Sequence, residues 1–165
     1  MTRSSTTAGT FQQAQLPAQA KLAAAWTSFM FLYIYVDYLH LYKPGAIDDI
    51  LAGVVFEFDI SQTFVVISLM LVGIPSLMIL LSMTLPARAN RTLNLVVASL
   101  YIPYSVVNAA GESWDWAAFY GLSIGLEVLL LALILRYAWT WPRTAPSATM
   151  ATSPDREAVR AQLQA

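Results

Sequence analysis

Four long apolar runs dominate this 165-residue chain and restrict what it can fold into. They cover roughly residues 22–42, 60–85, 93–110 and 116–139. Each run is near the ~20 residues that a helix needs to cross the ~30 Å hydrocarbon core of a bilayer. The runs are continuous rather than alternating, which favours helices over strands. The pattern therefore predicts an all-α, integral membrane four-helix bundle.

Composition supports a membrane protein and narrows its chemistry. Hydrophobic residues make up 58% of the chain and charged residues only 12%, too few charges for the surface of a soluble domain of this size. The net charge of −1 gives no reason to expect a nucleic-acid partner. The sequence contains no cysteine and one histidine, so disulfides, thiolate-held metal clusters and bis-histidine haem within one chain are excluded. Phosphate-loop, dinucleotide, metalloprotease and hydrolase motifs are also missing, so we expect no cofactor and no metal, and lean against an enzyme.

The predicted membrane domain spans residues 21–141, between two polar ends. Residues 1–20 are rich in Ser, Thr, Gln and Ala and lack the apolar core of a signal peptide. Residues 142–165 are rich in Pro, Ser, Ala and Thr and then charged. Both ends are predicted to be flexible and cytoplasmic.

The basic residues predict the orientation of the chain. Lys43 falls on one side of the predicted membrane, and the other basic residues fall on the opposite side: Arg3, Lys21, Arg88, Arg91, Arg136, Arg143, Arg156 and Arg160. The loops beside Lys43 are instead acidic, with Asp48, Asp49, Glu57, Asp59, Glu112 and Asp115. Because positive charges favour the cytoplasmic side, both termini are predicted to be cytoplasmic, in a bacterial inner membrane.

The first outer loop carries a pattern of its own. Its apolar residues follow the i, i+3, i+4, i+7, i+8 spacing of one helical face: Ile47, Ile50, Leu51, Val54 and Val55. This spacing predicts a short amphipathic helix on the outer surface. Capping the bundle is its simplest role, and a moving lid over a site is the alternative.

Two of the apolar runs carry acids, which are costly inside a bilayer and usually kept for a reason. Asp37 and His40 are three residues apart, so a helix places them on one face, which Tyr33 continues inward. Polar packing is the simpler interpretation of this pair, and a proton relay or ligand site is the alternative; one histidine with scattered carboxylates makes a poor metal site. Glu127 lies ~17 Å of helix rise from Trp116, near mid-membrane. It is expected to point into the bundle, as a functional group or as interhelical glue.

Other polar side chains gather at the same predicted depth. In the third run Asn94, Tyr101, Ser105 and Asn108 follow helical spacing, with Tyr104 beside them. We predict a polar pocket that opens outward between the first, third and fourth runs, with Glu127 as its floor. The predicted ligand- or proton-binding residues are Asp37, His40, Tyr104, Asn108, Tyr120, Ser123 and Glu127. The inner half has no comparable residue except Asn94, so a continuous channel is disfavoured.

Short segments in the chain resemble those of a family of small, uncharacterised bacterial four-helix membrane proteins. The segments are Tyr35-Val36-Asp37-Tyr38, Lys43-Pro44-Gly45, Ile74-Pro75-Ser76-Leu77-Met78 and Asn90-Arg91-Thr92-Leu93-Asn94. The resemblance covers about residues 20–140 and implies fold and location only, because the family brings no activity with it. The architecture is also similar to the broader class of DoxX-like four-helix proteins, at the level of the fold.

The favoured hypothesis is a multi-pass membrane protein whose outward-facing pocket binds or moves a small molecule or a proton. Asp37 and Glu127 would be its ionisable groups, and His40 would tune Asp37. An accessory subunit of a membrane complex is the first alternative. Gly121 and Gly125 form a G-x-x-x-G pair, which allows close helix approach within the chain, in a homo-oligomer or with a partner membrane protein. A membrane enzyme acting on a lipid or quinone is a weaker alternative.

Overall fold

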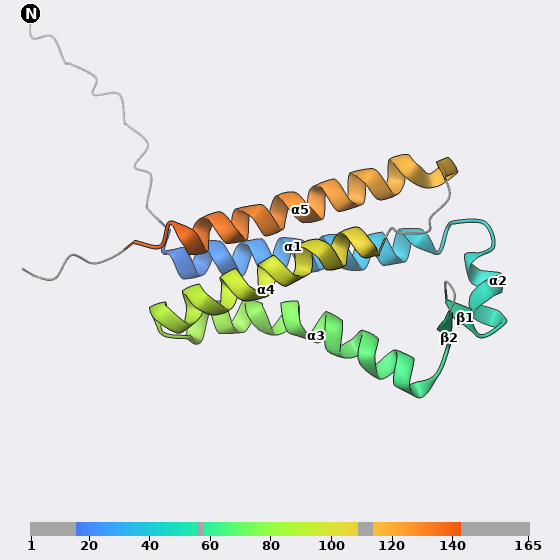
Figure 1. Ribbon diagram of the computed structural model, residues 1–165, viewed down its shortest axis with the longest axis horizontal. Helices are drawn as coiled ribbons and strands as arrows, with labels where there is room; N and C mark the ends of the chain where they lie inside the picture. Colours follow the sequence, from blue (N-terminus) through green and yellow to red (C-terminus); the bar gives the residue numbers. More distant parts are fainter. Residues whose placement is uncertain (1–15, 56–57, 109–113, 143–165) are drawn as a thin grey trace, which may run out of the picture.

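The computed structural model describes residues 16–55, 58–108 and 114–142, and this part of the chain is mostly helical (Figure 1). In chain order the elements are α1 (Ala18–His40), α2 (Ala46–Leu51), β1 (Val54–Val55), β2 (Phe58–Asp59), α3 (Gln62–Thr84), α4 (Ala87–Val107), the 3-10 turn η1 (Trp114–Trp116) and α5 (Ala117–Trp139). Most of the two ends predicted to be flexible, residues 1–20 and 142–165, lies outside the described residues, as do Glu57 and Glu112.

The long helices differ from the apolar runs at their ends. α1 stops at His40 because hydrogen bonds from the amides of residues 41–43 to carbonyls three residues earlier tighten the chain into turns before Pro44. α4 begins at Ala87, directly after Pro86, and its first turns carry Arg88 and Arg91. Hydropathy marks only the apolar part of a helix, so it could not show this polar beginning.

The first loop corrects the predicted amphipathic helix. α2 covers only the first part of the striped segment, and the two valines that follow form β1, which pairs antiparallel with β2. Gly53 lies between α2 and β1 in the left-handed conformation, with φ of 83°. A glycine in this conformation is the usual end of a helix, because it has no Cβ to clash. The helical spacing of Val54 and Val55 was therefore coincidental.

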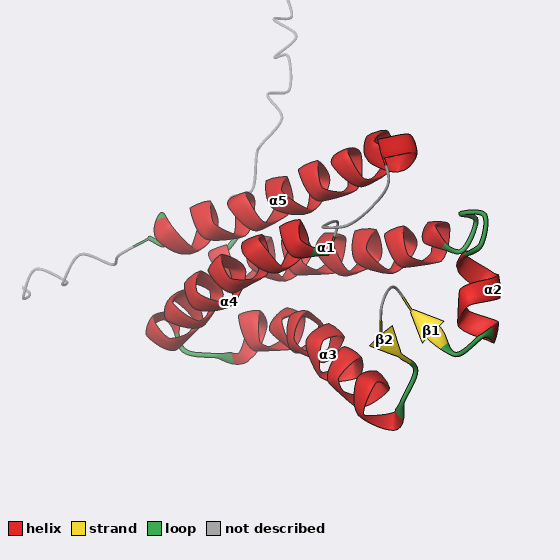
Figure 2. Cartoon of the chain, turned by 45° about the vertical axis from the view of Figure 1, so that its right-hand side comes forward, coloured by secondary structure: helices red, strands yellow, loops and turns green. Residues whose placement is uncertain are grey.

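The long helices are arranged in the order α3, α1, α5, α4 around the molecule (Figure 1). α1 packs against α3 on one side and α5 on the other, and α4 packs along α5. α4 and α3 are joined by a short connection and share few contacts, and α3 then diverges toward α2 and the hairpin (Figure 2). The molecule is consequently closed at the end where α3 meets α4 and wider at the end that holds α2, β1 and β2.

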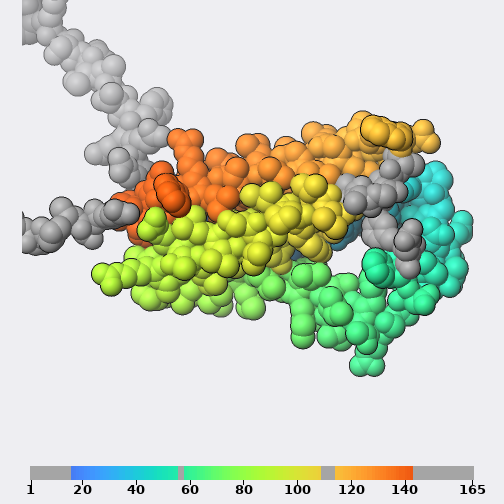
Figure 3. All heavy atoms as spheres, in the orientation of Figure 1, coloured from blue at the N-terminus to red at the C-terminus, as the bar shows by residue number. Residues whose placement is uncertain are grey.

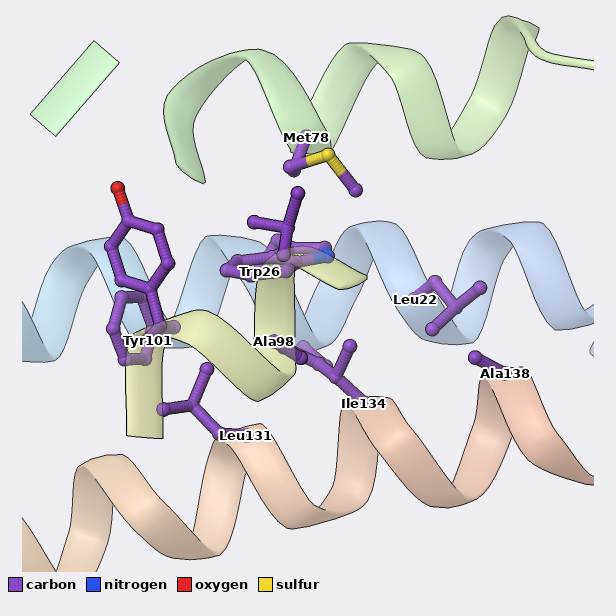
Figure 4. Packing of buried hydrophobic residues seen from close by; sticks show 11 residues of the cluster. Leu22, Trp26, Met78, Ala98, Tyr101, Leu131, Ile134 and Ala138 are labelled. Atoms are coloured by element: carbon purple, nitrogen blue, oxygen red, sulfur yellow. The ribbon is translucent and has the colours of Figure 1, made fainter. Parts of the chain in front are cut away.

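The hydrophobic core fills the closed end. Trp26 and Phe29 of α1 are fully buried, with ring centroids 5.7 Å apart and edge to face. Tyr101 of α4 meets both rings edge-on, at 6.3 Å and 6.0 Å. The other three helices surround this aromatic group with small and aliphatic side chains (Figure 4): Met78, Val97, Ala98, Leu131, Ile134 and Ala138.

Pro75 interrupts the hydrogen-bond ladder of α3 near its middle. Proline has no backbone N–H, so the carbonyl of Leu71, four residues earlier, loses its helical donor. The hydroxyl of Tyr101 donates a hydrogen bond to this carbonyl from α4. Within the described residues, no other hydrogen bond between α3 and α4 lies farther from the loop that joins them.

Three segments of the described chain are long and apolar enough to cross a membrane: Ala18–His40, Gln62–Thr84 and Trp114–Trp139. Many of their large apolar side chains are exposed, including Leu69 at 68% and Leu122 at 66%. Soluble proteins rarely expose apolar surface on this scale. The helices are thus compatible with residence in a membrane. α4 does not reach the same hydropathy, because its first half carries two arginines and two asparagines.

Candidate functional site

The wide end of the molecule contains a cavity of about 670 Å³. α1, α4 and α5 supply one side of it, and the first half of α3 supplies the other. α2, β1 and β2 contribute Ile50, Val55 and Phe58. The surface is hollowed between α3 and α4 in the space-filling view (Figure 3).

Every residue of the predicted site lines this one cavity: Asp37, His40, Tyr104, Asn108, Tyr120, Ser123 and Glu127. The structure adds Tyr33 and Ser105. The sequence had placed these two residues on the same helical faces without including them in the site. Their shared location follows from the helix order, which brings the polar faces of α1, α4 and α5 together. A ligand-binding role for these residues stays a prediction.

His40 contacts α5 across the cavity. Its Nδ1 atom lies 2.6 Å from the Tyr120 hydroxyl, in a hydrogen bond whose donor depends on the histidine tautomer. Lys43 stands over the ring of the same tyrosine, with its Nζ atom 5.7 Å from the ring centroid. The sequence expected His40 to serve Asp37, whereas the geometry joins it to Tyr120.

A second polar contact joins α1 to α4. The hydroxyls of Tyr33 and Tyr104 are 2.9 Å apart, and the Asn108 side-chain amide donates to the Tyr33 hydroxyl at 3.4 Å. The ring of Tyr33 stacks on Phe29, and that of Tyr104 meets Tyr101 edge-on. Aromatic packing therefore runs from the core to the cavity wall and fixes the positions of both hydroxyls.

The two acids of the cavity come from helices far apart in the sequence. Glu127 of α5 is only 5% exposed, Asp37 of α1 is exposed, and the two are close enough to interact electrostatically. Neither forms an ion pair with a described residue, and no Lys or Arg side chain is among the residues that line the cavity. An unpaired carboxylate in an apolar setting is costly, so a proton or another cation is the natural occupant.

Ser105 places a hydroxyl at the floor of the cavity, beside Glu127. It is 1% exposed, and its Oγ atom is close enough to stabilise the Glu127 carboxylate, although the two do not meet in full hydrogen-bond geometry and Oγ has no other partner among the described residues. Buried hydroxyls are usually hydrogen-bonded, so an unsatisfied one beside an acid needs an explanation. A bound polar group would satisfy both.

The opposite wall is apolar. α3 contributes Phe64, Ile67, Leu71 and Val72, and Ser68 is the polar exception. Ser68 donates its hydroxyl proton to the Phe64 carbonyl within its own helix, so little of its polarity is left for a ligand. The cavity therefore has two unlike faces, one with carboxylates and hydroxyls and the other with aliphatic and aromatic side chains.

The sequence missed a buried polar cluster at the closed end. Trp26 donates its indole N–H to Asn94 Oδ1 at 2.7 Å, and Asn94 donates to Asn90 Oδ1 at 2.7 Å. Asn90 in turn donates to the Ser82 carbonyl at 2.6 Å, and all four residues are 0% exposed. The i, i+4 spacing of the two asparagines was the available signal, but only Asn94 had been noted. The polar groups of this cluster are hydrogen-bonded to one another, so the cluster has a structural role and links α1, α3 and α4.

Gly121 and Gly125 do not pack closely against any described helix. Both are exposed, and a Cβ atom added at either would meet nothing within 4 Å among the described residues. The described residues therefore give no support to the intramolecular interpretation of the G-x-x-x-G pair. An interface with another chain stays a prediction. The described residues also contain no group of three or more His, Cys, Asp or Glu that could hold a metal ion.

These features define a helical protein with three membrane-length apolar segments and a two-faced cavity between its helices. The chain belongs to the family of unknown function DUF6326, whose sequence model matches residues 13–145. Comparisons with the curated proteins and with the solved structures found no match to this chain. The match supports the expected membership of an uncharacterised family and supplies no activity, so the function has to be argued from the cavity.

Proposed function

We propose that this protein spans a bacterial inner membrane with four helices, keeps both termini in the cytoplasm and binds a small molecule or a proton in an outward-facing cavity. α4 is the fourth span in this proposal. Its buried residues Val97, Ala98 and Tyr101 belong to the common core, and it packs along α5. Its arginines Arg88 and Arg91 would then lie at the cytoplasmic surface, where positive charge is favoured. The fold-level likeness to DoxX-like proteins stays a prediction.

The charges at the two ends support this orientation. The closed end carries Lys21, Arg88, Arg91 and Arg136 among the described residues. The Arg91 Nε atom donates to the Ala138 carbonyl at 3.2 Å, which places a cation at the C-terminal end of α5. The wide end carries Asp48, Asp49, Asp59 and Asp115 and one described basic residue, Lys43. By the positive-inside rule, the closed end would then face the cytoplasm and the cavity would open to the outside.

One observation carries the binding role: Asp37 and Glu127, from two helices, line the same cavity and neither is paired with a cation among the described residues. Acids retained inside a membrane protein without a structural partner usually serve an ion or substrate path. The Asp37→Asn, Glu127→Gln double variant should therefore lose any uptake or resistance phenotype that the wild-type gene restores to a deletion strain. The Asp115→Asn variant, which removes a charge outside the cavity, should keep it. An unchanged phenotype in the double variant at normal expression would contradict the proposal.

Thiol labelling tests whether water reaches the cavity from outside. The chain has no cysteine, so single cysteines can be introduced without background. Asn108→Cys and Ser123→Cys should react with a membrane-impermeant thiol reagent on intact cells, because both positions line the cavity. Ser82→Cys, in the buried cluster, should react only after denaturation. No reaction at either cavity position would mean that these polar residues are packed and that the cavity is not open to the outside.

An accessory subunit is the second candidate, and the open glycine face of α5 favours it. Gly121 and Gly125 leave room for another helix, which the described part of this chain does not supply. Purification in mild detergent should then yield a partner in fixed stoichiometry. That partner should be lost in the Gly121→Leu, Gly125→Leu variant, whereas purification of the chain alone in both forms would exclude this role.

A further inference from the structure

The chemistry of the cavity walls limits the class of ligand that the cavity can bind. We propose that it takes a lipophilic organic cation, which is a positively charged centre surrounded by apolar groups. This inference rests on the proposed binding function and deepens it by naming the ligand class.

The acidic side chains of the cavity wall favour a positively charged ligand. Asp37 and Glu127 place two carboxyls on one wall, and no Lys or Arg lines the cavity among the described residues. A metal ion is a poor occupant, because the described residues offer no group of three or more His, Cys, Asp or Glu. Metal sites built from oxygen ligands need more donors than two separate acids. An organic cation needs only the negative charge of the wall and no set of coordinating ligands.

The volume of the cavity and its apolar α3 wall favour a ligand with a large apolar part. The volume of about 670 Å³ lies within the range of pockets that enclose drug-sized molecules. The α3 wall offers Ile67, Leu71 and Val72 for apolar contact. Tyr33 and Tyr104 line the polar side, so that aromatic side chains stand there in addition to the two carboxyls. A small hydrated ion would leave the apolar wall without a partner.

The floor shows a place for a polar contact. The Ser105 hydroxyl is buried, lines the cavity and has no hydrogen-bond partner among the described residues. It lies beside Glu127, the more buried of the two acids. A ligand whose cationic end reaches Glu127 therefore also meets the Ser105 hydroxyl. This end of the ligand is expected at the floor, with its apolar part against α3.

The arrangement of the helices provides a way in from the bilayer. α3 and α4 are hydrogen-bonded to each other from the closed end only as far as the contact between Tyr101 and Leu71. Beyond it α3 diverges, and the surface is hollowed between the two helices (Figures 2 and 3). The exposed face of α3 is apolar, including Val65 and Leu69. An amphipathic cation that partitions into the membrane can reach the cavity along this seam.

The test uses tetraphenylphosphonium as the probe and tetraphenylborate as its counterpart of the same shape and opposite charge. Purified full-length protein in lipid nanodiscs should bind radiolabelled tetraphenylphosphonium saturably. Tetraphenylborate should not compete. The affinity should fall about tenfold or more in Glu127→Gln and in Asp37→Asn, because each removes one charge from the wall that meets the cation. The matched control Asp115→Asn should bind as the wild type does.

The outcomes separate the ligand class from the underlying function. Equal binding in wild type and in both acid variants, competition by tetraphenylborate, or no binding of the phosphonium would each overturn the cation proposal. If Ser123→Cys still reacts with an external thiol reagent in those cases, the outward cavity survives with another ligand. If neither Asn108→Cys nor Ser123→Cys reacts, the proposed function fails with it. Should Glu127→Gln fail to fold, Glu127→Asp, which is expected to keep binding, and Asp37→Asn carry the same test.

Discussion

The hydrogen bond between Tyr101 and the carbonyl of Leu71 should have a measurable effect on stability, and the cause lies in Pro75. Tyr101→Phe removes the hydroxyl and leaves a partly buried carbonyl without its helical donor or the hydroxyl that replaces it. Leaving such a group unsatisfied costs about 1–3 kcal/mol, and side-chain hydrogen bonds measured in membrane proteins average about 0.6 kcal/mol. We therefore expect Tyr101→Phe to lower the free energy of unfolding by about 1–2 kcal/mol.

A double-mutant cycle isolates this cause. Pro75→Ala restores a backbone N–H that can donate to Leu71, so the tyrosine hydroxyl is no longer needed at that carbonyl. Tyr101→Phe should then cost about 1 kcal/mol less in the Pro75→Ala background than in wild type, as expected for residues that share one partner. Reversible unfolding in mixed detergent micelles, followed by circular dichroism, measures both effects. Tyr137→Phe is the matched control, because this partly buried tyrosine makes no hydrogen bond with a described residue. Strictly additive costs in the cycle would refute the reasoning.

Three further predictions follow from the described contacts. Asn94→Leu should destabilise the fold by about 2–3 kcal/mol in the same unfolding assay, because it leaves the buried indole N–H of Trp26 without an acceptor; a cost within error would contradict a satisfied cluster. Gly53→Ala should cost about 1–2 kcal/mol, since its φ of 83° is unfavourable for a residue with a Cβ; an unchanged unfolding midpoint would refute this. Gly121→Ala with Gly125→Ala should leave the unfolding free energy equal or higher, because no described residue lies within 4 Å of a Cβ atom added at either position. If the glycines hold a second copy, the same variant should lower the cross-linked dimer fraction, and an unchanged fraction would exclude that interface.

The sequence was most informative where hydrophobicity and helical spacing act along one element. The apolar runs located the long helices, and the spacing of Asp37 with Tyr33 and of Ser105 with Asn108 placed these residues on common faces that line the cavity. It was least informative where one element depends on another. Five apolar residues at helical spacing followed Gly45, yet the last two form a strand, because pairing with β2 and the turn at Gly53 override the spacing.

Contacts between helices were also beyond the sequence. His40 bonds Tyr120, eighty positions away in the sequence. The buried cluster of Asn90 and Asn94 closes on the Ser82 backbone and on Trp26, so this tryptophan is a buried hydrogen-bond partner rather than an anchor at the membrane interface. A tryptophan near the end of an apolar run is compatible with both roles, and the choice depends on which helix faces it. Local sequence patterns therefore predicted which residues share a helix face. Which residues of other helices they contact was determined by tertiary packing.

The two fixed ends of α3 account for a cavity that does not collapse. An apolar helix wall tends to close on its neighbours, because empty space forfeits dispersion contacts. α3 is held at its closed end by the bonds of Ser82 to the asparagines and by the tie from Tyr101 to Leu71. Its other end follows directly from β2, and the hairpin is fixed in turn by the Ile60 amide, which donates to the Gly53 carbonyl at 2.7 Å. Because α2 and the hairpin stand between α1 and the start of α3, the part of α3 that precedes Leu71 is kept away from α4. The space beside Asp37 and Glu127 is therefore a consequence of how the chain connects α1 to α3, and shortening that connection should close the cavity before it unfolds the core.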